Sequence, residues 1–140
     1  MRPGRVAIAV VAGLALAALS CGWSARADDA GPAGFTQAQA DQGGDVYRAN
    51  CATCHGPNLN DGEFAPSLKG VRFKAKWSGQ SVGALYAYVS ANMPPGQVGV
   101  LGPDDYAELV AYLLQANGAK AGDKPLPADP QALSGVKWPG

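Results

Sequence analysis

The chain has 140 residues, enough for one domain, and its 11 basic and 11 acidic residues give a formal net charge of zero. Nucleic-acid binding and attachment to anionic membranes both depend on a basic excess, so this balance argues against both partners. Glycine and proline number 19 and 11, which is above average usage and indicates long loops. Hydrophobic residues make up 47% of the chain, which excludes a disordered protein.

The first 27 residues have the features of an export signal. Arg2 and Arg5 precede an uncharged run over residues 6–19, which is too short to span a bilayer as a helix. An A-x-A cleavage site follows and ends at Ala27. Cleavage there would remove three arginines and no acid, so the mature chain would be acidic. The sequence therefore predicts a periplasmic protein that keeps no transmembrane span after processing.

Two alternatives stay open for this segment. The apolar run could remain uncleaved as a short anchor. Cys21, which ends the degenerate lipoprotein box Ala18-Leu19-Ser20-Cys21, could instead carry a lipid and tether the protein to the membrane. Ala18 is smaller than the aliphatic residue that such boxes usually carry, which favours cleavage after Ala27.

Helical patterns alternate with long loops along the rest of the chain. Residues 28–36 are small and polar and predict a flexible N-terminal segment. Thr36 and Gln39 form a capping-box signature that opens a helix ending near Asn50. Residues 56–79 are expected to be loop. No segment alternates as a strand would, so the fold class is all-α.

Two further helices are expected towards the C-terminus. Residues 81–92 carry apolar residues at helical spacing, and Met93-Pro94-Pro95-Gly96 ends that helix. Gly102-Pro103-Asp104 opens the last helix, which stops at Gly118. Residues 118–140 hold four prolines and no periodic pattern, which is typical of a C-terminal tail.

The chemistry of the chain concentrates in Cys51-Ala52-Thr53-Cys54-His55. This C-x-x-C-H pattern is the attachment sequence of a c-type haem. Two thiols at this spacing add across the two vinyl groups of the porphyrin edge, and the next residue points its imidazole at the iron. An export signal fits, because this haem is attached outside the cytoplasm. We expect one haem c, covalently bound by Cys51 and Cys54, with His55 as an axial ligand of the iron.

Three other interpretations of the motif are weaker. A structural zinc site needs four nitrogen or sulfur ligands. Residues 28–140 contain only three cysteines and histidines, namely Cys51, Cys54 and His55, and the one other sulfur is that of Met93. A thioredoxin-like pair belongs beside a strand in an α/β fold, and no such strand is predicted. A plain disulfide in an oxidising compartment leaves the adjacent histidine unexplained.

Met93 is the candidate for the sixth ligand of the iron. A lone methionine is ordinarily core filler. Here it is the one methionine after residue 27, it follows a helix, and the rigid Pro94-Pro95 pair fixes the chain beside it. Iron held by His55 and Met93 offers no open position to a substrate, so the expected function is electron transfer and not enzymatic catalysis.

The chain resembles class I c-type cytochromes over residues 37–117. The segments that carry this resemblance are Cys51-Ala52-Thr53-Cys54-His55-Gly56, Ala65-Pro66-Ser67-Leu68, Asn92-Met93-Pro94-Pro95-Gly96 and Leu109-Val110-Ala111-Tyr112-Leu113. The resemblance implies a cytochrome c fold of three to five helices around one haem. When two segments of the tail are included, the chain is most similar to the small cytochrome c subunits that accompany quinoprotein alcohol dehydrogenases.

The resemblance also implies roles for residues around the haem. The Pro66 carbonyl would accept the Nδ1–H of the proximal histidine, Trp77 would donate to a propionate, and Leu68 and Pro94 would line the pocket. Gly43 and Tyr47 would lie where the first helix crosses the last one, at Leu109 and Tyr112. The basic cluster of Lys69, Arg72, Lys74 and Lys76 could neutralise propionates, meet a partner or form a solvated loop.

The implied function is that of a periplasmic electron carrier of a respiratory chain. Single electrons would pass from a quinoprotein dehydrogenase to an oxidase, another cytochrome or another respiratory acceptor. A haem-based sensor or a peroxidatic cytochrome with a labile sixth ligand is the main alternative, and a purely structural export domain is the other. The partner is expected to dock on the apolar rim that residues 93–101 form.

Overall fold

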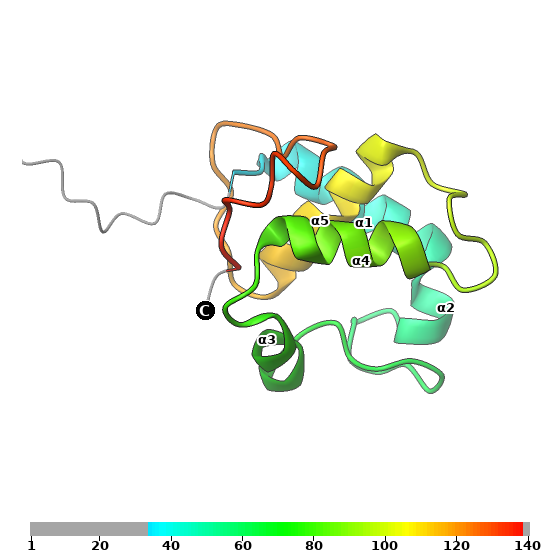
Figure 1. The fold of residues 1–140 in the computed structure, drawn as a ribbon. Helices are drawn as coiled ribbons and strands as arrows, with labels where there is room; N and C mark the ends of the chain where they lie inside the picture. The colour runs from blue at the N-terminus through cyan, green and yellow to red at the C-terminus, as the bar shows by residue number, and fades with distance from the viewer. Residues whose placement is uncertain (1–33, 139–140) are drawn as a thin grey trace, which may run out of the picture.

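The computed structural model describes residues 34–138. The expected export signal, its cleavage site, Cys21 and residues 28–33 of the N-terminal segment lie outside these residues. The described part of the chain contains five helices and no sheet (Figure 1), which confirms the all-α prediction. The helices are α1 (Gln37–Asn50), α2 (Ala52–His55), α3 (Val71–Trp77), α4 (Val82–Asn92) and α5 (Pro103–Ala116). None of these helices is long and apolar enough to cross a membrane.

Helix α1 begins at the predicted place, but its capping box is only half formed. The Thr36 side chain accepts a hydrogen bond from the Gln39 backbone N–H at 3.2 Å, as a cap should. The Gln39 side chain does not accept the second hydrogen bond of the box, from the Thr36 backbone N–H. It is buried and makes two hydrogen bonds to the backbone of Leu126, at 2.9 and 2.8 Å. The start of α1 is therefore tied to the C-terminal tail.

Helices α1 and α5 form the central pair of the fold (Figure 1). At their crossing Gly43 faces the backbone of Glu108, and a Cβ atom on Gly43 would stand only 1.9 Å from the Glu108 carbonyl oxygen. Beside it the rings of Tyr47 and Tyr112 pack with centroids 5.5 Å apart. The expected crossing is present, and it depends on a residue without a side chain.

Helix α3 corrects the expectation that residues 56–79 are loop throughout. Phe73 and Trp77, four residues apart, are buried on one side of α3, whereas the rest of the helix is largely polar or exposed. Two apolar residues at this spacing are a weak signal in a helix of two turns. Packing against the tail holds this short helix, since the rings of Phe73 and Trp138 meet edge to face at 5.6 Å.

The tail packs along the helices over its described length. Leu126, Leu133 and Trp138 are buried. The backbone N–H groups of Val82 and Gly83 donate to the carbonyls of Val136 and Leu133, and so the tail caps the start of α4. Residues 118–138 therefore contribute to the core although they show no periodic pattern.

Candidate haem-binding site

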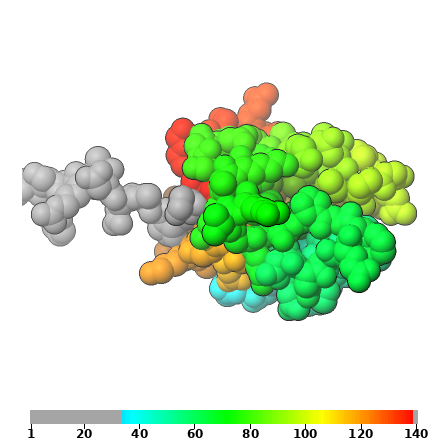
Figure 2. Space-filling model, turned by 90° about the horizontal axis from the view of Figure 1, so that it is seen from below, coloured from blue at the N-terminus to red at the C-terminus, as the bar shows by residue number. Residues whose placement is uncertain are grey.

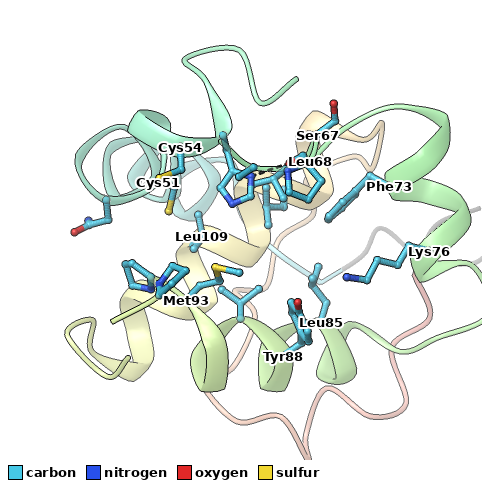
Figure 3. Close-up of a pocket in the computed structure, with 18 of the residues that line it drawn as sticks. Cys51, Cys54, Ser67, Leu68, Phe73, Lys76, Leu85, Tyr88, Met93 and Leu109 are labelled. Carbon is cyan, nitrogen blue, oxygen red and sulfur yellow. Dashed lines mark hydrogen bonds between the residues drawn. The ribbon is translucent and has the colours of Figure 1, made fainter. Parts of the chain in front are cut away.

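A cavity of about 620 Å³ lies between α2, α3, α4 and α5 (Figure 3), within the range of cofactor sites. Every residue that the sequence singled out as a haem attachment, ligand or pocket residue lines it: Cys51, Cys54, His55, Pro66, Leu68, Trp77, Met93 and Pro94. These residues come from four separate segments, so the fold brings together residues that are scattered along the sequence. In Figure 3 the two cysteines lie at one end of the cavity and Lys76 at the other.

One wall of the cavity is built around α2, which carries the C-x-x-C-H motif. His55 is 92% buried, and its Nδ1 lies 2.8 Å from the Pro66 carbonyl oxygen. This hydrogen bond fixes the plane of the ring and makes Nδ1 the donor, which leaves Nε2 free to bind a metal. The contact is the one that the resemblance implies for Pro66.

Tyr47 fixes α2 against α1. Its hydroxyl donates to the Gly56 carbonyl at 2.5 Å, just after the motif. Burial, with a smaller contribution from the neighbouring Cys51, raises the pKa of Tyr47 to about 12, so the hydroxyl keeps its proton at neutral pH and remains a donor. Gly56 itself has a φ of 82°, in the region that favours glycine.

Met93 lies on the other side of the cavity, directly after α4. Its N–H donates to the Val89 carbonyl at 2.9 Å as the cap of that helix. Its side chain is partly buried against the core. Figure 3 shows Met93 across the cavity from Ser67 and Leu68, which flank Pro66. The Met93 side chain thus lies across the cavity from the loop whose Pro66 carbonyl holds the His55 ring.

The two cysteines are not joined in a disulfide. Burial, and to a smaller extent the nearby Cys54, raises the pKa of the Cys51 thiol to about 11. Thioredoxin-like cysteines need the opposite shift, because the thiolate is their reactive form. The raised pKa of the Cys51 thiol therefore gives no support to a thiol–disulfide function, and both sulfurs lie beside a large, mostly apolar cavity.

The residues at the far end of the cavity fit the carboxylates of a haem. Trp77 lines the cavity, is 96% buried, and its indole N–H has no hydrogen-bond partner. A buried donor without a partner costs free energy unless a bound group accepts from it. Trp138 is the other described residue with such an indole, and it does not line the cavity.

The basic cluster is divided between the cavity and the surface. Arg72 and Lys76 line the cavity, whereas Lys69 and Lys74 do not. The Lys76 ammonium lies 5.3 Å from the centre of the Trp77 ring and 4.5 Å from that of Tyr88, which are cation–π distances. Two cations and a free indole N–H at one end, with two thiols at the other, match the polarity of a haem.

Part of the cavity lining carries little signal in the sequence. Phe64, Phe73 and Tyr88 face the cavity but were not singled out. Phe73 shares with Trp77 a four-residue spacing, which is only a weak signal of α3. Phe64 carries no such signal, because it lies in a loop and is 79% exposed.

Comparisons with known proteins agree with this site. The family described as cytochrome c oxidase, cbb3-type, subunit III matches residues 38–113. A Synechocystis protein described as cytochrome c-553-like is 36% identical over 74 residues, which are 53% of this chain and 66% of that relative, just under two thirds of its length. No solved structure matches. Neither description names an alcohol dehydrogenase.

The family match covers more than half of the chain and contains the whole C-x-x-C-H motif. A c-type cytochrome domain with one such motif carries one covalent haem c. The chain therefore belongs to this family and is a monohaem c-type cytochrome domain.

Proposed function

We propose that this cytochrome carries single electrons at an iron held between His55 and Met93. The observation that supports the proposal is that both side chains line one cavity together with the two cysteines of the motif, with Met93 across the cavity from the loop whose Pro66 holds the His55 ring. When bound, the haem supplies a one-electron iron couple. His55 would hold the iron from one side with its ring fixed by Pro66, and Met93 would fill the opposite position and exclude small ligands.

Replacing Met93 with alanine tests this ligation. The ferric protein should lose the weak red charge-transfer band of iron–thioether ligation, bind imidazole readily, and show a lower reduction potential, because a thioether favours the reduced iron. Val98→Ala is the matched control, since Val98 lies in the same loop, is 53% exposed and does not line the cavity. Absorption spectra and potentiometry measure these changes.

Two outcomes would contradict the proposed ligation. An unchanged spectrum in Met93→Ala would show that another group, or none, occupies the sixth position. Fast stoichiometric binding of carbon monoxide by the reduced wild-type protein would show a labile sixth ligand, as in a sensor or a peroxidatic cytochrome.

We propose further that the electrons come from a quinoprotein dehydrogenase and pass to an oxidase or another respiratory acceptor. The similarity to cytochrome subunits of quinoprotein alcohol dehydrogenases supports the donor, and the family's description as an oxidase subunit supports the acceptor. The surface supports an apolar contact. Figure 2 shows the 56–66 and 93–101 loops at the same end of one face, and Phe64, Val98 and Val100 are 79%, 53% and 58% exposed on them.

Reduction by the dehydrogenase should therefore depend little on salt. Screening weakens attraction between exposed charges and leaves apolar contact in place. We expect the stopped-flow reduction rate to change less than about threefold between low and physiological salt. Val98→Ser should slow reduction, whereas Lys74→Gln should not. A drop of about tenfold with salt, matched by a slow Lys74→Gln variant, would show that the basic cluster governs docking.

We propose that the protein works in the periplasm as residues 28–140, with a cytochrome domain preceded by a short flexible segment. The charged and apolar pattern of residues 1–27 supports an export signal. A lipid on Cys21 would instead tether the protein to the membrane. The intact mass of the exported protein distinguishes these outcomes, because the mature chain should begin at Asp28.

A further inference from the structure

The loop between α4 and α5 begins at Met93, and it packs on the core chiefly through Met93 and Leu101 near its two ends. Within the loop, the Gln97 and Val100 N–H groups donate to the carbonyls of Pro94 and Gln97. Val98 and Val100 point largely to solvent. The middle of the loop therefore has turns of its own but is exposed, with few contacts that would keep it closed over the cavity.

One hydroxyl group joins the two ends of this loop. Tyr106, on the first turns of α5, donates to the Met93 carbonyl at 2.9 Å and accepts from the Gly99 N–H at 3.4 Å. Among the residues that the structure describes, no other hydrogen bond joins residues 93–101 to a side chain outside the loop. The tyrosine hydroxyl can serve both partners because it is a donor and an acceptor.

Tyr106 is itself held firmly. It is 96% buried, and its ring packs edge to face against Tyr86 with centroids 6.3 Å apart. The Tyr86 hydroxyl donates to the Pro103 carbonyl at 3.0 Å, where α5 begins. Neither tyrosine lines the haem cavity. Tyr106 can therefore act on the iron site only through the backbone of Met93.

We infer that Tyr106 is the positioning residue for Met93: its hydroxyl keeps the 93–101 loop closed and slows the departure of the Met93 thioether from the iron. This inference rests on the proposed ligation by Met93. A loop with few other anchors has to move when its methionine leaves the iron, so the strength of this one anchor sets the rate. The apolar docking rim on the same loop is held by the same contact.

The test is ligand exchange in Tyr106→Phe, with imidazole as the probe. At saturating imidazole the exchange rate of the ferric protein reports the departure of Met93. Loss of one hydroxyl with two partners should raise this rate about fivefold, while the thioether band stays present. Tyr86→Phe is the matched control, because it removes the other hydroxyl of the ring pair, and its exchange rate should remain near that of the wild type.

A second measurement separates this inference from the ligation itself. Amide hydrogen exchange at Gly99 should accelerate in Tyr106→Phe, and not in Tyr86→Phe, whichever group binds the iron. If Met93→Ala left the spectrum unchanged while Gly99 still responded to Tyr106→Phe, the ligation would be wrong and the loop anchor right. Equal imidazole rates in both tyrosine variants, fast or slow, would overturn the positioning role.

Discussion

Acid–acetone extraction of the denatured protein should leave the haem on the chain, and the intact mass should equal residues 28–140 plus one haem. The reason is the C-x-x-C-H motif, whose two thiols stand at one end of a cavity large enough for a cofactor. A Cys51→Ser/Cys54→Ser double variant should release all its haem. Single variants should keep at most one thioether, and His55→Ala should prevent maturation.

Thr53→Ala is the matched control for these variants. Thr53 lies inside the motif, is exposed and does not line the cavity, so its holoprotein should form normally. Haem that is extracted freely from the wild-type protein would contradict covalent attachment, whatever the iron ligands are.

The same cavity predicts that the chain without haem does not keep this fold. Buried core residues such as Leu85, Leu109 and Leu113 line it. Without haem these apolar side chains would face water or a cavity of about 620 Å³, and the lost burial would weigh heavily on a fold whose whole stability is only about 5–15 kcal/mol. After its haem has been extracted and the solvent exchanged back to buffer, the double-cysteine variant should therefore show little helix by circular dichroism, whereas Thr53→Ala, which keeps its haem through the same treatment, should regain it.

Most of the site was predictable because its key residues are chemically distinctive. The C-x-x-C-H spacing specifies the haem, and Met93 stood out because little else beyond residue 27 could bind iron opposite His55. The long helices were predictable for a similar reason, since their apolar faces repeat at helical spacing over several turns. The predicted helix over residues 81–92 differs from α4 by a single residue.

The parts that were missed depend on contacts between distant segments. Helix α3 is too short for a periodic signal and is stabilised by the tail through Phe73 and Trp138. The tail is irregular, so its buried Leu126 and Leu133 give no pattern. The pairing of Gln39 with Leu126 joins residues 87 positions apart, and local sequence suggested a capping box instead. Nothing in the local sequence marks the Tyr106 hydroxyl as a partner of the Met93 carbonyl, because the two residues meet only through the folding of the loop between them.

Adding a single methyl group at Gly43 should destabilise the protein strongly. The Cβ of Gly43→Ala would stand 1.9 Å from the Glu108 carbonyl oxygen and 2.9 Å from the Tyr112 Cβ. Backbone cannot move aside as a flexible side chain can, so α1 and α5 would have to separate along the centre of the core. Overpacking of this kind costs about 1–3 kcal/mol or more, against a gain in helix propensity of up to about 1 kcal/mol.

Gly44→Ala provides the control one residue away. It lies in the same helix and is also buried, but its added Cβ would meet the nearest Tyr112 ring atom at 3.4 Å, an ordinary contact. The propensity gain should then dominate and leave stability equal or slightly higher. Guanidinium unfolding of the ferric holoproteins measures both. A Gly43→Ala protein as stable as Gly44→Ala would show that α1 and α5 do not approach this closely, and that the crossing on which the haem cavity is built has been misplaced.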